Sequence, residues 1–309
     1  ATTTDIDFPS PIRADKDGKH FHPIGLDRPL RLSNLDKVFF PDSGYTKGDL
    51  IQYYASVAPV ILPHLADRPL SMNRFPDGID GGSFYEKRAP GHQPDWMRTV
   101  PVVSDSQGGV IDFLVADNLE AMMWFANMGC IEVHPFHSRD GNLDNPDYAI
   151  FDFDPGGMLL KVALEQLGLK GYPKLSGSKG LHVYVPLEPV HSYERVRRFV
   201  GEVGSYLASA NPDDLTMEWD KPKRKGKVFV DHNRNASGQT VASAYSVRPR
   251  PGAPVSVPLL WDEVPEIKNG EITIANLWPR IQKHGDLFSP VFEGGQTLDK
   301  AEEALEIKS

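Results

Sequence analysis

The segment from Tyr148 to Gly157 constrains the fold of this chain more than any other. Its apolar and aromatic start predicts a buried strand, and side chains two residues apart on a strand share a face. Asp152 and Asp154 should therefore project together. Because Pro155 and the glycines after it end the strand at once, the pair lies at a strand terminus, where a site can open to solvent. Two adjacent carboxylates repel each other unless a positive charge lies between them, so a divalent cation is the expected occupant.

The composition is that of an ordinary globular protein. The chain has 309 residues, 40% of them hydrophobic, which suffices for one large domain in two lobes or for two domains. Apolar runs stay below the ~18 residues that a membrane-spanning helix needs, and the N-terminus does not resemble a signal peptide. We therefore expect a cytoplasmic protein with no membrane partner. Cys130 is the single cysteine, which excludes an internal disulfide, and the sequon at Asn235 is expected to be accidental.

The charge distribution leaves room for a local nucleic-acid site. A net charge of -9 argues against a surface that is basic everywhere, but binding to nucleic acid needs only a basic patch. Five cations lie within seven residues: Lys221, Lys223, Arg224, Lys225 and Lys227. A solvated basic turn is the alternative interpretation of such a run.

Strand and helix patterns alternate along the chain and indicate an α/β or α+β fold with a mixed sheet. Thr46 is a predicted N-cap with Asp49 three residues later, at the start of a helix that reaches Ile61 and bends at Pro59. The other predicted helices cover 118–128, 158–169, 193–207 and, on the surface, 297–308. The predicted strands cover 70–75, 83–88, 110–115, 131–135, 148–153, 172–175, 181–187, 215–219, 227–231 and 240–247.

A second apolar strand, 227–231, also ends in an aspartate, Asp231. Three carboxylates that converge from adjacent strand ends can hold two divalent ions ~3.5–4 Å apart, which activates an attacking oxygen and stabilises a leaving phosphate. Together with Asp152 and Asp154, this pattern predicts phosphoryl-transfer chemistry. The aspartate pair alone is weaker evidence, because capped turns and glycosyltransferases contain similar pairs. A metal-dependent glycosyltransferase would leave Asp231 unexplained.

The segment Ser176–Gly180, followed by Leu181 and His182, is a candidate anion-binding loop. Its small residues let backbone amides approach an anion, and its lysine and histidine can bind one. It is not a Walker A loop, because a strand rather than a helix follows it. A flexible hairpin tip is the alternative, and His182 and His134 could equally be core histidines. Arg248 ends another predicted strand and could neutralise a triphosphate or form a surface ion pair.

Three segments in this order along the chain resemble the archaeo-eukaryotic primase superfamily: the strand end Asp152–Gly156, the loop Ser176–His182 and the strand Val228–Asp231. The closest resemblance is to the polymerase domain of bacterial DNA ligase D and its stand-alone primase-polymerase relatives. The resemblance implies an α+β primase-type catalytic core in two lobes over 31–290, in which an RRM-like mixed sheet packs with a second α/β lobe. Residues 1–30 would be an N-terminal extension and 291–309 a C-terminal tail. The implied activity is metal-dependent, template-directed transfer of NTPs or dNTPs to DNA primer ends, at short gaps and broken ends, in repair or end joining.

The resemblance also implies roles for individual residues. Asp152, Asp154 and Asp231 would bind two divalent ions, Mn²⁺ or Mg²⁺, and Asp231 would assist attack by the primer 3′-hydroxyl. The residues implied to hold the incoming triphosphate are Ser176, Lys179, Gly180, His182, His134 and Arg248. The residues implied to bind DNA are Lys37 and Lys47 at the 5′-phosphate of a gap, Phe84 and Tyr85 stacked on template bases, and Arg224 near the active site. Without the resemblance, Phe84 and Tyr85 would be assigned to the core.

The sequence contains no ligase or nuclease module, so we expect either a stand-alone enzyme or an excised domain. Candidate partners are a separate DNA ligase and end-binding repair proteins. The alternative from another functional class is a catalytically silent module that binds DNA ends and tethers them for a ligase. Such a module needs the basic run and the aromatic pair but not the carboxylates, so nucleotide incorporation by the purified chain separates the two functions.

Overall fold

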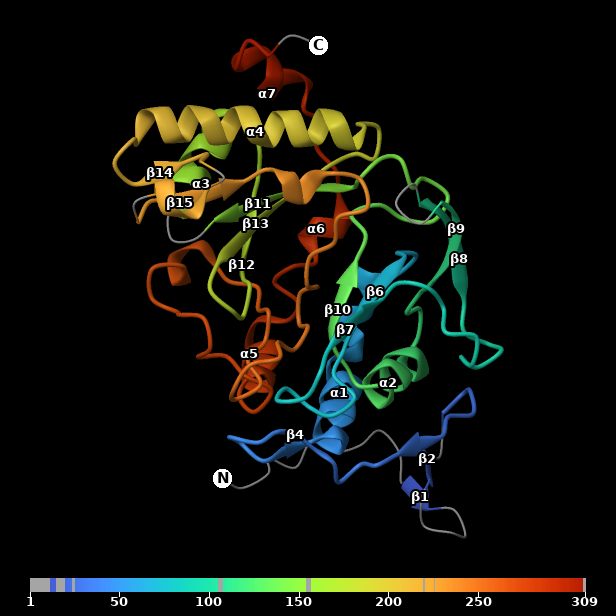
Figure 1. Ribbon diagram of the computed structural model, residues 1–309. Coiled ribbons are helices and arrows are strands. Elements are labelled where there is room, and N and C mark those ends of the chain that lie inside the picture. The colour runs from blue at the N-terminus through green and yellow to red at the C-terminus, as the bar shows by residue number, and fades with distance from the viewer. Residues whose placement is uncertain are drawn as a thin grey trace. The chain divides into compact units, whose positions relative to one another are not determined.

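The computed structural model describes residues 12–14, 20–23, 26–104, 108–153, 157–218, 220–224 and 226–307 (Figure 1). The chain divides into two compact units and passes between them more than once. The first unit comprises 1–135, 242–255 and 272–285, and the second comprises 136–241, 256–271 and 286–309. The domain boundaries at residues 30 and 290 remain predictions.

The first unit is built on an antiparallel sheet in the order β10-β6-β9-β8, with β7 also paired to β6. Its strands are β6 (Leu70–Arg74), β7 (Phe84–Glu86), β8 (Thr99–Ser104), β9 (Gly109–Leu114) and β10 (Cys130–Pro135). Its helices are α1 (Lys47–Leu65), α2 (Leu119–Asn127) and α5 (Leu277–His284). Shorter strands are β1 (Ile12–Ala14), β2 (His20–Pro23), β3 (Leu32–Ser33), β4 (Val38–Phe40) and β5 (Tyr45–Thr46). The predicted cap of α1 is confirmed, because Thr46 and Asp49 form a reciprocal capping box.

The second unit contains a mixed sheet in the order β12-β13-β11-β15-β14. Every pair in it is antiparallel except β14 with β15, which is parallel. The strands are β11 (Tyr148–Phe153), β12 (Tyr172–Leu175), β13 (Leu181–Pro186), β14 (Leu215–Thr216) and β15 (Val228–Asp231). The helices are α3 (Gly157–Gln166), α4 (Tyr193–Ala210), α6 (Pro290–Glu293), α7 (Asp299–Ala304) and the short 3₁₀ helices η2 (Lys221–Arg224), η3 (Asn233–Asn235) and η4 (Trp261–Glu263). The predicted α+β fold with a mixed sheet is confirmed.

Helix α4 lies along this sheet (Figure 1) and buries one apolar face. Val196, Phe199 and Val203 recur at helical spacing and are almost completely buried, each worth roughly 1.5–3 kcal/mol of apolar burial. Gly204 allows a close approach, because a Cβ there would lie 2.8 Å from Val230 Cγ1. The helix therefore supports β15 one residue before Asp231.

Two strand predictions differ from the structure. The strand predicted over 240–247 is wrong, because the segment makes only isolated bridges and Tyr245 has a φ of 64°, which an extended strand does not tolerate. Its apolar residues are nevertheless buried, which produced the strand-like pattern. The strand predicted over 215–219 is shorter, because β14 ends at Thr216, while Trp219 lies outside the described residues. Within the described part of the chain, no helix has the length and apolar character needed to cross a membrane.

Asn235 substitutes for a strand partner beyond the end of β15. Strand β15 pairs with β11 only at Asp152 and Phe153, which leaves the backbone of Ile150 without a partner on that side. The buried Asn235 side chain fills the gap, because its Oδ1 accepts from Ile150 N (2.8 Å) and its Nδ2 donates to Ile150 O (2.7 Å). A carboxamide bonded at both ends and buried cannot carry a glycan, so the folded chain does not use the sequon.

Replacing Asn235 with alanine should lower the free energy of unfolding by roughly 2–4 kcal/mol, because the amide and carbonyl of Ile150 lose their partner. Urea denaturation followed by circular dichroism measures the change. The matched control is Ser237→Ala in the same loop, where the side chain is exposed, with an expected change within about 0.5 kcal/mol. Equal effects of the two variants would contradict this account.

Candidate active site

One register row crosses four strands of the mixed sheet and carries polar side chains throughout. Lys174 on β12 pairs with His182 on β13, His182 pairs with Asp152 on β11, and Asp152 pairs with Asp231 on β15. Residues directly opposite each other in a sheet project to the same face, so the four side chains form a line. The row contains two predicted metal ligands and one predicted triphosphate ligand, and Lys174 is an addition to the prediction.

The two aspartates at the end of the row converge on a common cation. Arg234 Nε lies 3.5 Å from Oδ2 of Asp152 and 3.5 Å from Oδ2 of Asp231. The carboxylates keep 24% and 14% of their side-chain surface exposed, so solutes can reach them. Adjacent carboxylate oxygens that already attract one cation have the donor chemistry that Mg²⁺ or Mn²⁺ requires. The pair therefore fits a divalent cation.

The third predicted ligand, Asp154, lies outside the described residues, as do Pro155 and Gly156. Within the ranges that the structure describes, no three His, Cys, Asp or Glu side chains gather as a metal site. The predicted three-carboxylate arrangement thus remains a prediction, while the convergence of Asp152 and Asp231 is observed.

Lys174 and His182 form a buried pair behind the carboxylates. Lys174 Nζ lies 3.1 Å from His182 Nδ1 and donates to Ser256 Oγ at 2.7 Å. The side chains of Lys174 and His182 are both buried, and Lys174 Nζ also lies 5.5 Å from the ring centre of Tyr184. When Lys174 carries its ammonium charge it has only donors, so Nδ1 of His182 accepts and the proton of a neutral His182 lies on Nε2. That nitrogen is 3.6 Å from Asp152 Oδ1, which directs the N–H towards the carboxylate side.

The predicted anion-binding loop is closed on its own serine. Ser176 Oγ accepts from the backbone amides of Ser178 (3.2 Å), Lys179 (3.2 Å) and Gly180 (3.0 Å). Gly177 allows this turn, because its φ of 71° lies in the left-handed region. The amides therefore point at Ser176 rather than directly outward, and three donors on one oxygen polarise its O–H. Ser176 is then a strong hydrogen-bond donor towards an anion.

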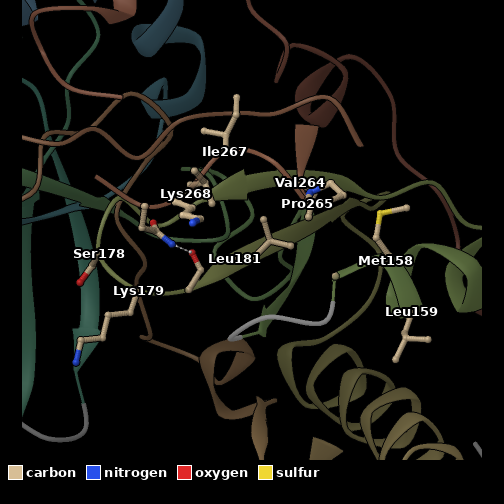
Figure 2. A pocket seen from close by; sticks show the side chains of 13 residues that line it. Met158, Leu159, Ser178, Lys179, Leu181, Val264, Pro265, Ile267 and Lys268 are labelled. Atoms are coloured by element: carbon tan, nitrogen blue, oxygen red, sulfur yellow. Dashed lines mark hydrogen bonds between the residues drawn. The ribbon is translucent and has the colours of Figure 1, made fainter. Parts of the chain in front are cut away.

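A cavity of about 650 Å³ lies beside this loop. Figure 2 shows Met158 and Leu159 at the start of α3 on one side and Val264, Pro265, Ile267 and Lys268 along another, with Leu181 between them. Asn269 fixes the loop by donating from Nδ2 to Gly180 O at 3.1 Å. The Lys179 side chain is exposed and extends away from the apolar wall, so its ammonium is free to reach an anion at the loop.

In the first unit, the buried Glu132 organises the two other predicted triphosphate ligands. His134 Nε2 lies 3.3 Å from Glu132 Oε2, and Arg248 Nε lies 2.6 Å from Glu132 Oε1. Asn73 Nδ2 donates to Glu132 Oε2 at 2.6 Å. Burial by itself raises the pKa of Glu132, but the hydrogen bond and charge of His134, with Arg248 and Asn73, hold that pKa below its usual value. Glu132 is thus an anion that fixes His134 and Arg248 in one cluster.

The two predicted 5′-phosphate lysines are also electrostatically coupled within the first unit. Lys47 is buried and donates to Ser33 O at 2.7 Å, and Lys37 donates to Pro76 O at 2.7 Å and contacts Asp77. Burial, followed by the positive charges of Lys37 and Arg74, lowers the pKa of Lys47 to about 8. A bound anion would stabilise the charged form of Lys47 and thereby raise its pKa again.

The aromatic pair lies on the surface, so the alternative assignment of Phe84 and Tyr85 to the core is wrong. Their exposed fractions are 45% and 57%. The Arg74 guanidinium lies 5.2 Å from the ring centre of Phe84, and the ring of Tyr85 packs edge-on against His134 at 5.5 Å. Exposed rings held by neighbours in this way can present a face to a nucleobase.

Arg224, in the basic run, is held on strand β15. Its guanidinium lies 3.8 Å from the ring centre of Phe229, and its Nε donates to Glu218 O at 2.9 Å. Lys223 forms an exposed ion pair with Asp220 at 3.5 Å. Lys225 lies outside the described residues. The part of the run from Lys221 to Arg224 thus forms the 3₁₀ helix η2, shortly before β15, which ends in Asp231.

Sequence reasoning missed Lys174 and Glu132, although the two share a signal. Each is a charged residue within a short strand that is otherwise apolar or buried, Tyr172–Leu175 and Cys130–Pro135. A charged group in such a strand needs polar partners, and these partners are residues that the sequence motifs predict: His182, His134 and Arg248. Arg234, three residues after Asp231, carried no comparable signal.

The chain is similar to known proteins over most of its length. The family model described as "LigD, primase-polymerase domain" matches residues 46–288. The chain is 33% identical to the multifunctional non-homologous end joining protein LigD of Mycolicibacterium smegmatis, over 90% of this chain and 38% of that protein. It is 30% identical to the bifunctional LigD of Bacillus subtilis, over 86% of this chain and 45% of that protein. The chain thus spans less than half the length of these curated relatives.

A solved structure is similar over most of its length. The polymerase domain of Mycobacterium tuberculosis ligase D in complex with DNA matches with a TM-score of 0.81 and 32% sequence identity. The match covers 86% of this chain and 99% of that one. The similarity therefore extends to the fold as a whole and is not confined to the motifs.

Replacing Lys174 with methionine should remove the preference of His182 for the Nε2-protonated tautomer, because Nδ1 loses the hydrogen-bond donor that keeps it unprotonated. The ¹⁵N chemical shifts of the His182 imidazole measure which nitrogen carries the proton, with Nε2 expected in the wild type and a mixture of tautomers in the variant. The matched control is Lys170→Met, where the residue is exposed and the shifts should not move. Unchanged shifts in Lys174→Met would show that the lysine does not orient the histidine.

Proposed function

The chain belongs to the LigD primase-polymerase domain family, whose members are nucleotidyltransferases, and from this premise we propose its reaction and substrates. The proposed reaction is the metal-dependent, template-directed transfer of NTPs or dNTPs to DNA primer ends at short gaps and broken ends. The observation that carries this proposal is the convergence of Asp152 and Asp231 on one cation, in the same row as His182.

Asp152 and Asp231, with Asp154, are the proposed ligands of two divalent cations. When bound there, the cations would supply positive charge to the α-phosphate and to the leaving pyrophosphate and would lower the pKa of the attacking hydroxyl. Asp231 is proposed to orient the primer 3′-hydroxyl and to accept its proton. Its side chain suits this role because it is partly exposed at the very end of β15.

The triphosphate is proposed to lie at the Ser176 loop. Ser176 would donate a hydrogen bond from its polarised O–H to a phosphate oxygen, and the exposed ammonium of Lys179 would contribute a positive charge. Gly180 would allow the backbone to approach the phosphate closely. His182 would donate from Nε2 to a phosphate oxygen, since Lys174 occupies its other nitrogen. His134 and Arg248, fixed by Glu132, are proposed to add a donor and a positive charge.

The DNA is proposed to contact the first unit through a phosphate and through bases. Lys37 and Lys47 would bind the 5′-phosphate at the far side of a gap, and Phe84 and Tyr85 would stack on template bases. Base stacking on such rings is worth ~1–3 kcal/mol per base and tolerates any sequence. Arg224 would add a phosphate contact near the catalytic carboxylates. A site of this kind binds DNA without reading its sequence and with a strong dependence on salt.

The proposed biological setting is end joining, because the similar proteins of Mycolicibacterium smegmatis and Bacillus subtilis are non-homologous end joining proteins. A DNA ligase and end-binding proteins would act on the same broken ends. The alternative, a silent tethering module, has no use for two partly exposed carboxylates directed at one cation. Nucleotide incorporation by the purified chain is the deciding measurement between the two.

Replacing Asp231 with asparagine should reduce primer extension on a gapped duplex with Mn²⁺ by roughly 10²–10⁴-fold, because the 3′-hydroxyl loses its proton acceptor. Gel-based extension of a labelled primer measures the rate, and fluorescence anisotropy should show DNA binding within about threefold of the wild type. Asp214→Asn, at an exposed position of the same unit, is the matched control with unchanged extension. Near-normal extension by Asp231→Asn would sink the proposed mechanism.

Preference for a 5′-phosphate at the gap should weaken as the pH rises through about 8. The lowered pKa of Lys47 means that its ammonium is charged below this value and loses its proton above it. The measurement is the ratio of dissociation constants for gapped DNA with and without the phosphate, between pH 6.5 and 9.

The control for this pH dependence is the double variant Lys37→Ala, Lys47→Ala, which should show a ratio near one at every pH. A preference that survives in the double variant would remove the assigned role of the lysines. A wild-type ratio that stays constant across the range would contradict the participation of Lys47 as an ammonium.

A further inference from the structure

A second cavity, of about 350 Å³, opens directly beside Asp231 in the second unit. Its lining is rich in hydrogen-bond donors: Arg197, Asn233, Arg234 and Gln239, together with Asp231 and Ala236. Arg197 is exposed on α4, and no described carboxylate forms an ion pair with it. Two arginines and two residues with carboxamide side chains therefore line a space next to the proposed catalytic carboxylate.

We propose that this cavity binds a backbone phosphate of the primer strand, close to its 3′ end, with Arg197 as the principal contact. The proposal deepens the function proposed above and rests on it for the identity of the strand. A phosphodiester is the ligand class that matches the lining, because guanidinium groups bind phosphate oxygens with paired N–H donors and amide groups add neutral ones.

The order of the strands supports this assignment. The Ser176 loop joins β12 to β13, the carboxylates follow on β11 and β15, and Arg234 comes after β15. Phe153 of β11 pairs with Leu181 directly after the loop, whereas Ile150 of β11 bonds Asn235, among the residues that follow β15. Along β11, the Asp152–Asp231 pair thus lies between the triphosphate loop and the segment that lines the arginine cavity. In nucleotidyl transfer the attacking and leaving oxygens lie roughly in line on opposite sides of phosphorus. If the leaving pyrophosphate is at the loop, the attacking strand must approach from the Arg197 side.

The neighbouring residue Arg198 provides a matched control. It is also an exposed arginine on α4, but it lines a different cavity, with Glu194, Glu202 and His232, to which Asp231 does not contribute. Arg197 lines both cavities. Removing Arg198 changes the net charge of the helix by the same amount without removing a guanidinium from the space beside Asp231.

The test compares DNA binding by protein variants and chemically modified primers, and it does not require nucleotide transfer. Equilibrium binding of the full chain to a gapped primer–template is measured by fluorescence anisotropy without nucleotide, for the wild type, Arg197→Ala and Arg198→Ala. Each protein is measured with a natural primer and with primers that carry one neutral methylphosphonate at each of the last three linkages. A salt series gives the number of phosphate contacts.

Arg197→Ala should weaken binding of the natural primer roughly tenfold, the loss expected for one charge-assisted contact. It should also reduce the salt slope by about one unit. One methylphosphonate should weaken the wild type to a similar degree and leave Arg197→Ala unaffected, while Arg198→Ala should behave as the wild type. Arg197→Lys should restore part of the affinity, because it keeps the charge.

The proposal fails if Arg197→Ala binds the natural primer as well as Arg198→Ala does, or if every methylphosphonate weakens Arg197→Ala as much as it weakens the wild type. In a separate extension assay, Arg197→Ala should raise the KM for the primer–template and leave the KM for the nucleotide within about twofold. Absence of extension by the wild type would count against the proposed function, whereas the binding cycle would still decide the phosphate contact.

Discussion

The register of four strands in the second unit is the constraint on which the candidate site depends. Pairing of β12, β13, β11 and β15 aligns Lys174, His182, Asp152 and Asp231 in one row on one face. Because the side-chain period of a strand is two, a slip of one residue in any pair would send part of this row to the opposite face. Asn235 protects the register where β15 ends, since its carboxamide satisfies the backbone of Ile150. Helix α4 supports β15 from one side, and the absence of a side chain at Gly204 allows the contact.

One buried residue of a charged type positions candidate site residues in each unit, and each of the two is hydrogen-bonded. Lys174 donates to His182 and Ser256, and Glu132 accepts from Asn73 and contacts His134 and Arg248. An unpaired charge at either position would cost several kcal/mol, so these partners are held where they are by the same electrostatics that keep the fold intact. His182 in the second unit, and His134 and Arg248 in the first, are thus each fixed by a buried charged-type side chain.

The candidate site residues were predictable to the extent that they lie in short segments of the sequence with a local pattern. The apolar strand that ends at Asp152, the apolar strand that ends at Asp231 and the small residues of the Ser176 loop were each visible as local patterns. The wrong strand prediction over 240–247 has a physical cause. The segment 240–247 has the composition of a strand because it is buried. Its backbone amides, however, do not form a continuous ladder with another strand: Val247 N donates to the side chain of Tyr54 on α1, and Ser243 N donates to Val133 O on β10. Burial and strand pairing leave the same trace in a sequence.

The sequence predicted the class of chemistry, because carboxylates at strand ends, a small-residue loop with a lysine and the order of the three segments are properties of the chain. It could not determine that Arg234 bridges the two aspartates, that Lys174 occupies one nitrogen of His182, or that Ser176 collects three amides of its own loop. These contacts depend on which strands become neighbours and in which register. Lys174 and Ser256, for example, are 82 residues apart in the chain and 2.7 Å apart in space. Such groups meet only in the folded chain, because a hydrogen bond depends on the distance between two atoms in space. The residues near Lys174 in the sequence do not indicate which distant residue will be its partner.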